Sequence, residues 1–240
     1  MSNVLTNYLN KRLVEDSPSK KQNWQEAGPV ITISREVGCN GLKLAHKLAE
    51  SLNRKKRSEN WKVLSKEVFH QSAEELNMEP ENVRRVFKQT SKYAFEDILK
   101  AFNNKNYKSD RKIANTVSEA VLSFAIDGYS IIVGRAAHII ASEITNALHL
   151  RLTAPLEYRV KNIQINNSLN HEEAVRFIAK VEKERIAFRK AIREENLREE
   201  LFDLTLNRSS FETDELVDII EIAMAKKGMI IEARSNVQFF

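Results

Sequence analysis

The sequence has little of the residues that mark several classes of protein. One cysteine among 240 residues excludes an internal disulfide framework and is typical of a reducing, cytoplasmic compartment. Six glycines and four prolines, with 30% charged residues, favour a helix-rich fold over an all-β one. No apolar run approaches the roughly 18 residues of a membrane helix, and the N-terminus is polar (Asn3, Asn7, Asn10) rather than signal-like. We therefore expect a cytoplasmic protein without a membrane partner.

The charge is mildly basic, because 38 lysines and arginines stand against 33 acidic residues, for a net charge of +5. A basic surface attracts nucleic acid, anionic lipid or small phosphates, but solvated charged helices would give the same composition. Aromatic and basic residues are not interleaved as in single-strand binders. Nucleic acid is therefore not the expected partner, although a basic interaction module remains an alternative, testable by the salt dependence of RNA or DNA binding.

Three regions divide the chain. Residues 1–27 are predicted to form a short N-terminal helix, Val4–Val14, and a polar linker that contains Pro18. Residues 28–227 form the predicted core domain. Residues 228–240 form a C-terminal tail that ends in two phenylalanines.

Short apolar segments alternate with helical patterns in the core. The strands are expected at Val30–Ile33, Trp61–Leu64, Ser130–Val133, Ala147–Leu152 and Phe202–Leu206. The helices are expected at Leu42–Asn53, Lys66–Leu76, Asp110–Asp127, Ala136–Glu143, Pro155–Ile165, His171–Asn196 and Thr213–Lys227, and Asn170 with Glu173 predicts a capping box. Such alternation indicates an α/β fold, a parallel sheet covered by helices on both faces.

Polar or glycine-containing segments follow four of these strands. They are Ser34–Gly41, Ser65–Glu67, Gly134–Arg135 and Asn207. Ligands of open α/β sheets bind at the carboxyl ends of the strands. The topology therefore predicts that these four segments surround one site.

The segment Ser34–Gly41 has the layout of a phosphate-binding loop, a strand followed by a glycine-containing turn and an amphipathic helix. Gly38 permits turn conformations that other residues resist, and Asn40 tolerates the left-handed region. The pattern G-x-x-x-x-G-K-[ST] is absent, however. When Gly38 is aligned with the middle glycine of a G-x-x-G-x-G-K-[ST] loop, Gly41 stands at the lysine and Leu42 at the hydroxyl that would hold Mg²⁺. The nearest cations are Arg35 and Lys43.

Six colinear segments resemble the cytidylate-kinase-like family, a branch of the P-loop nucleoside monophosphate kinases. The first is ITISREVGCNG followed by LAHKLAE, and the second is Ser65-Lys66-Glu67, similar to the family's Asp-Lys-Glu. The others are IIVGRAAHII (131–140), LHLRLTAPLEYRVKNI (148–163), KVEKERIAFRK (180–190) and LFDLTLNRS (201–209). Together they cover about residues 28–225.

The resemblance implies a P-loop kinase fold, three-layer α/β/α, with a parallel five-stranded sheet and a helical lid over about residues 166–198. It implies transfer of a phosphoryl group from ATP, with Mg²⁺, to CMP, dCMP or a related small acceptor. Arg135, Arg185 and Arg189 would be the catalytic residues, and Lys66 and Glu67 would bind the acceptor. The residues that would hold ATP are Ser34, Arg35, Gly38, Cys39, Asn40, Gly41, Leu42, Lys43 and Asn207.

Several features leave alternatives open. Ala136 stands where cytidylate kinases carry an aspartate, and no residue is assigned to the metal, with Glu36 and Glu67 the nearest carboxylates. A non-catalytic nucleotide or phosphate sensor on the same fold is therefore the main alternative. Salt bridges could account for the lid arginines and a structural ion pair for Arg135. Cys39 is either a thiol of lowered pKa at a helix start or a small replacement for serine.

Overall fold

The computed structural model describes residues 27–55, 59–65, 118, 121–196 and 200–230. Its strands are β1 (Val30–Arg35), β2 (Lys62–Leu64), β3 (Ser130–Val133), β4 (Ala147–Thr153) and β5 (Leu204–Asn207). Its helices are α2 (Gly41–Arg54), α7 (Ala137–Ile140), α8 (Leu156–Asn167), α9 (His171–Asn196) and α10 (Thr213–Lys226). None of the helices in these ranges is both long and apolar enough to span a bilayer. The predicted helices Val4–Val14 and Lys66–Leu76, the linker and most of the C-terminal tail lie outside the described residues.

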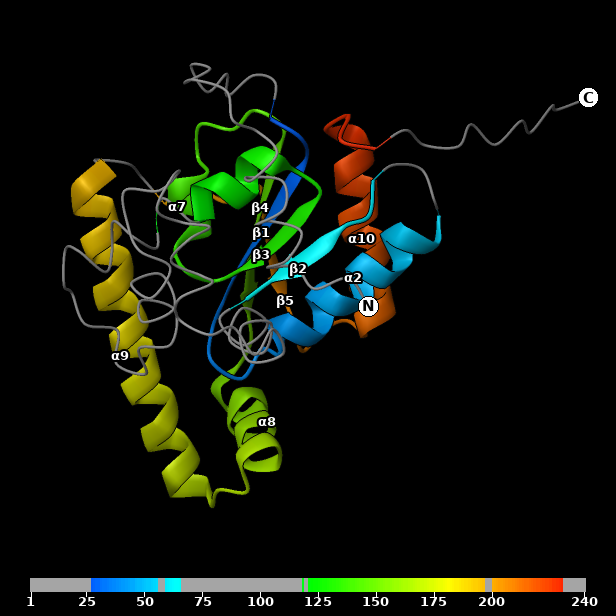
Figure 1. Ribbon diagram of the computed structural model, residues 1–240. Helices are drawn as coiled ribbons and strands as arrows, with labels where there is room; N and C mark the ends of the chain where they lie inside the picture. Colours follow the sequence, from blue (N-terminus) through cyan, green and yellow to red (C-terminus); the bar gives the residue numbers. More distant parts are fainter. Residues whose placement is uncertain (1–26, 56–58, 66–117, 119–120, 197–199, 231–240) are drawn as a thin grey trace, which may run out of the picture.

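The five strands form one parallel sheet in the order β2-β3-β1-β4-β5. Figure 1 shows α2 and α10 on one face of the sheet and α7 and α9 on the other, with α8 beneath one edge. The three-layer α/β/α fold and the parallel five-stranded sheet are therefore confirmed. Because all strands run the same way, the segments that follow β1, β3 and β4 meet at one edge.

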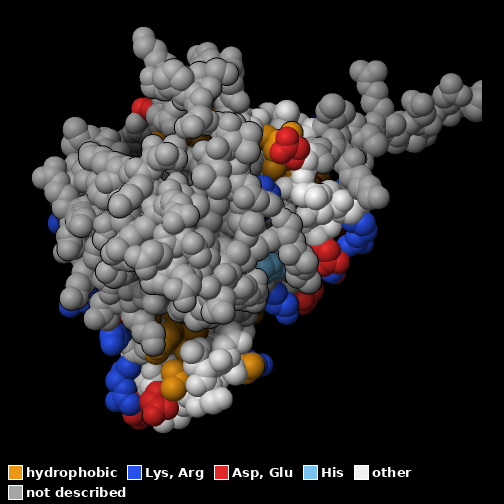
Figure 2. Space-filling view, viewed as in Figure 1, with side chains coloured by type: hydrophobic (Ala, Val, Ile, Leu, Met, Phe, Trp, Pro, Cys, Tyr) orange, Lys and Arg blue, Asp and Glu red, His pale blue; other side chains and the backbone are white. Residues whose placement is uncertain are grey.

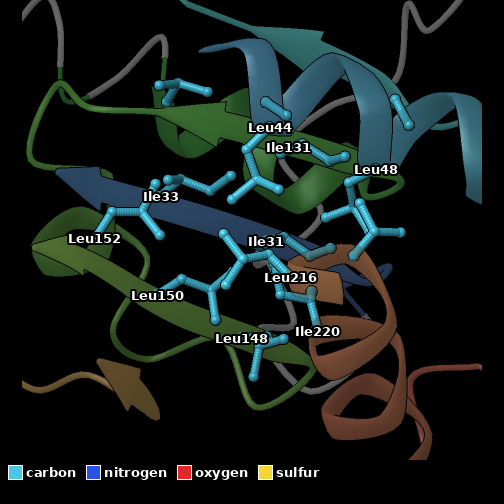
Figure 3. Packing of buried hydrophobic residues seen from close by; sticks show 14 of the residues in the cluster. Ile31, Ile33, Leu44, Leu48, Ile131, Leu148, Leu150, Leu152, Leu216 and Ile220 are labelled. Carbon is cyan, nitrogen blue, oxygen red and sulfur yellow. The ribbon is translucent and has the colours of Figure 1, made fainter. Parts of the chain in front are cut away.

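The main core lies between the sheet and the layer of α2 and α10. β3 (SIIV) is buried along its whole length, and its sequence is a nearly continuous apolar run. β1 (VITISR) and β4 (ALHLRLT) alternate apolar with polar residues, and the apolar residues of both strands are buried. Leucines spaced four apart on α2, Leu44 and Leu48, contact this face of the sheet, as Figure 3 shows. α10 adds Leu216 and Ile220. This packing fixes the position of the end of β1 and therefore the start of the loop before α2.

Some element bounds differ from the predictions, for local reasons. β1 extends through Ser34 and Arg35, because both residues pair with β4 at Arg151 and Leu152. β5 begins at Leu204 rather than at residue 202. The Asp203 carboxylate Oδ2 accepts the backbone N–H of His149 at 2.6 Å, so a side chain replaces a backbone partner there.

The helix after β3 is shorter than predicted, Ala137–Ile140 instead of Ala136–Glu143. Ala136 takes a left-handed conformation (φ 53°) and cannot begin the helix. The helix His171–Asn196 has the predicted bounds. Its capping box is confirmed too, since the Asn170 Oδ1 and Glu173 Oε2 atoms each accept the other residue's backbone N–H at 2.9 Å.

His149 on β4 makes the stability of the sheet depend on pH. Its Nδ1 lies 2.8 Å from the Oγ1 of the buried Thr32, and burial lowers the pKa of His149 to about 4. The unfolded chain takes up this proton near pH 6.5 while the folded one resists it, so stability is complete above pH 6.5 and falls as the pH drops toward 4. We expect a loss of about 3 kcal/mol from this group by pH 4.

Urea unfolding at several pH values checks this expectation, with His149→Gln as the matched variant. The variant should show a flatter profile between pH 6.5 and 4. The remaining slope should come from carboxylates such as Asp203, whose pKa is lowered by the bonds that it accepts from the His149 backbone and Lys227. Equal slopes in the two proteins would contradict the assignment.

Candidate phosphate-binding site

The loop between β1 and α2 spans residues 36–40 and turns sharply. Gly38 has φ +93°, and a Cβ at this position would lie 2.6 Å from the backbone oxygen of Arg159 on α8. Asn40, the N-cap of α2, takes the left-handed conformation with φ 50°. Only glycine satisfies both the torsion and the close approach at position 38.

The loop is held from outside by α8 and α9. The Nδ2 of Asn162 donates to the Gly38 carbonyl at 2.8 Å, and the Nδ2 of Asn166 donates to Asn40 Oδ1 at 3.0 Å. Val37 is buried in an apolar cluster with Val160 and Ile163 of α8 and with residues of α9. The shape of the loop therefore depends on the α8–α9 pair as well as on the sheet.

A carboxylate from α9 already contacts the loop. The backbone N–H of Val37 donates to Glu182 Oε1 at 2.5 Å. Backbone N–H groups of such loops are donors for phosphate oxygens. A phosphate bound at this donor would therefore replace Glu182, and α9 would have to shift or rotate that side chain.

A pocket lined mainly by cationic side chains opens beside the loop. It is lined by Ser34, Arg35, Gly134, Arg135, Ala136, His138, Arg185, Phe188 and Arg189. Four arginines thus converge from the ends of β1 and β3 and from α9. All three predicted catalytic residues line it, and so do Ser34 and Arg35 from the predicted ATP-binding set.

Arg135 is positioned by an unusual turn after β3. Gly134, Arg135 and Ala136 all have positive φ, at 81°, 54° and 53°. For the two residues with a Cβ this conformation costs energy, and such strain concentrates at functional sites. The turn buries Arg135, with 7% of its surface exposed, and places its guanidinium 5.8 Å from the ring centre of Phe188.

The two arginines of α9 are spaced four residues apart and so lie on one face of the helix. Nη1 of Arg185 donates to the backbone carbonyl of Arg35 at 3.0 Å, which joins α9 to the end of β1. Its Nε is buried without a hydrogen-bond partner among the described residues. Nε of Arg189 donates to Glu200 at 3.3 Å. The salt-bridge alternative therefore applies in part to Arg189, which pairs with Glu200, and not to the bond from Arg185 to a backbone carbonyl.

His138 lines the pocket and was not predicted to belong to the site. It stacks on Phe202 with ring centres 4.6 Å apart, and its Nε2 lies 3.4 Å from Glu200 Oε2. Burial lowers the pKa of His138, so this is a hydrogen bond from a neutral ring. The bond from His138, with the charge of Arg189, lowers the pKa of Glu200 to about 2. In the sequence His138 is a single histidine without metal-ligand spacing, so no motif indicated that it belongs to the site.

The remaining predicted residues lie away from the pocket or outside the described chain. Asn207 ends β5, and its Oδ1 accepts bonds from the backbone and hydroxyl of Ser209. Leu42 packs against the main core, and Lys43 is exposed on α2. Lys66 and Glu67 lie outside the described residues. The possibility of a lowered thiol pKa was wrong, because burial raises the pKa of Cys39 to about 11.

The described carboxylates do not fit a metal site. Within the described ranges, no group of three or more His, Cys, Asp or Glu residues is placed to hold an ion. Glu36, one of the two carboxylates expected nearest the site, accepts the backbone N–H of Ala154 at 3.0 Å and lies 3.5 Å from Arg159 Nε. We therefore assign no residue to Mg²⁺.

The fold and the arginine pocket together define an α/β protein with a phosphate-loop layout at the carboxyl edge of its sheet. The family model described as "Cytidylate kinase-like family" matches residues 30–210. The chain belongs to this family.

Two further comparisons are more distant. The crystal structure of an uncharacterized protein from Eubacterium ventriosum superposes with a TM-score of 0.56 at 18% identity, covering 82% of this chain and 98% of that one, and so shares the fold. A uronate isomerase from Corynebacterium glutamicum is 25% identical over 123 residues, which make up 51% of this chain. The match spans 24% of that enzyme's length.

Proposed function

We propose that this protein transfers the terminal phosphoryl group of ATP to CMP, dCMP or a related small phosphorylated acceptor. The observation that carries the proposal is the convergence of four arginines in one pocket where β1 and β3 end. Guanidinium groups bind phosphate oxygens bidentately and keep their charge at any physiological pH. Membership of the cytidylate kinase-like family supports the same chemistry.

Phosphoryl transfer requires positioning and charge neutralisation more than covalent catalysis. Arg135, fixed by its turn, would hold the phosphate that is transferred or accepted. Arg185 and Arg189 would close on it from α9, which we propose acts as the lid. Mg²⁺ would arrive bound to the phosphates of ATP and neutralise part of their charge.

The visible described surface is consistent with a small-molecule partner. Figure 2 shows lysine and arginine side chains interspersed with aspartate and glutamate on the described parts of this face. Because the whole chain sets 38 basic residues against 33 acidic ones, mixed charge favours local binding of a phosphate in the pocket over a broad electrostatic surface for nucleic acid.

A nucleotide or phosphate sensor on the same fold is the second candidate. Two observations favour it. Gly41 and Leu42 stand where the lysine and hydroxyl of the phosphate loop would be, and the Glu182 carboxylate occupies the Val37 donor. Such a protein would bind the nucleotide and leave it intact.

Calorimetric titration with MgATP, CMP and dCMP, followed by a phosphoryl-transfer assay, separates these functions. For the kinase we expect dissociation constants between about 1 μM and 1 mM, with turnover of at least one acceptor. Binding without turnover across several nucleoside monophosphates would favour the sensor. No binding of any nucleotide in the presence of Mg²⁺ would exclude the kinase and a nucleotide sensor.

A further inference from the structure

The side chain of Arg35 follows a path that two glycines keep open. A Cβ at Gly41 would lie 3.2 Å from Cγ and 3.4 Å from Cδ of Arg35, so the aliphatic stem passes directly over the start of α2. At the far end, a Cβ at Gly134 would overlap Nη1 of Arg35. The guanidinium therefore reaches from the end of β1 across to the turn after β3, where the pocket lies.

Gly41 is the position at which a phosphate loop carries its lysine. In such loops the lysine side chain rises from the first turn of the helix and reaches the β- and γ-phosphates. In this chain the stem of Arg35 lies so close to Gly41 that a side chain at position 41 would have to push it aside by a few tenths of an ångström. The stem of Arg35 therefore passes the position at which a lysine side chain would begin, and that position is a glycine.

We propose that Arg35 takes the place of the loop lysine, supplying from the strand the cation that other phosphate loops supply from the helix. Lys43, the other nearby cation, is exposed on α2 and is not among the residues that line the pocket. Arg185 of α9 donates to the Arg35 carbonyl, so the lid contacts the same residue. This inference rests on the proposed function, because it assigns Arg35 a role toward the ATP phosphates.

Moving the cation back to the helix tests the proposal. In Arg35→Ala the atoms Cγ and Cδ are gone, so position 41 can accept a long side chain. The double variant Arg35→Ala/Gly41→Lys relocates the charge, and Arg35→Ala/Gly41→Ala is its neutral match. The readout is calorimetric binding of inorganic triphosphate, with MgATP as a second probe, and it needs no turnover.

We expect Arg35→Ala to bind triphosphate at least about tenfold more weakly than the wild type. The lysine double variant should recover most of that loss, and the alanine double variant should recover none. If Arg35→Ala does not fold, Arg35→Met keeps the stem over Gly41 without its charge, and it should show the same weakening.

Two results would overturn the proposal. One is triphosphate binding by a folded Arg35 variant that equals the wild type. The other is equal recovery by the lysine and alanine double variants. In both cases the wild type binds, so the proposed function survives. If the wild type itself binds neither triphosphate nor MgATP, the proposed function fails, and this inference fails with it.

Discussion

Replacing Arg135 with alanine is expected to lower the rate of phosphoryl transfer about a thousandfold, with a smaller effect on MgATP affinity. An arginine that contacts the transferred group stabilises charge that develops in the transition state, and such groups contribute at least this factor. Arg135 is the most buried of the four pocket arginines and lies in a turn of three residues with positive φ. Single-turnover kinetics with saturating nucleotide measures the loss.

The backbone permits this test. Ala136 adopts nearly the same left-handed torsion as Arg135, so an alanine is tolerated in this turn. Arg135→Lys keeps the charge but not the bidentate geometry, and we expect a loss between those of wild type and alanine. Thermal unfolding of each variant should show a folded protein. A folded Arg135→Ala protein that keeps a tenth or more of wild-type turnover would rule out a catalytic role for this side chain.

Gly38→Ala is expected to destabilise the protein by on the order of 3 kcal/mol and to weaken nucleotide binding. The new Cβ meets the Arg159 backbone of α8 at a torsion of +93°, so both overpacking and backbone strain oppose it. The loop can relieve this only by moving off α8, which breaks the bond from Asn162 to its carbonyl. Urea unfolding and MgATP titration measure the two effects.

Gly228→Ala is the matched control. Gly228 also has a positive φ, +72°, but no described atom lies within 4 Å of the Cβ that would be added. This variant should lose only about 1 kcal/mol, the cost of the torsion alone. Equal destabilisation by the two substitutions would show that the approach of α8 to the loop does not matter.

The sequence allowed most of the fold to be predicted, because its short strands are marked either by a continuous apolar run or by alternation of apolar and polar residues. The run at Ser130–Val133 is apolar because helices cover both faces of the sheet there, whereas Ala147–Leu152 alternates apolar residues with His149 and Arg151. The bounds that failed are those decided by single side chains or torsions. The bond to the Asp203 carboxylate makes β5 begin at Leu204, and the left-handed torsion of Ala136 makes α7 begin at Ala137.

The part of the site that is built from strand ends could be predicted from the topology of the sheet. Strand ends converge in any parallel sheet, so the proximity of Arg35 to Arg135 followed from their positions at the end of β1 and just after β3. Contacts between distant segments could not be predicted. The Glu182 carboxylate on the loop and the His138–Glu200 bond join residues 145 and 62 positions apart, which no local pattern encodes.

The single cysteine of the chain allows the rate at which the loop opens to be measured. Cys39 lies in the loop, is completely buried, and has a thiol whose pKa is raised to about 11, so a thiol reagent reacts only after the loop opens and exposes it. No other thiol in the protein competes for the label. Cys39 belongs to the main core between the sheet and α2, so the labelling rate of the unmodified protein reports how often the β1–α2 connection opens from that core. Its dependence on nucleotide reports whether binding keeps the connection closed.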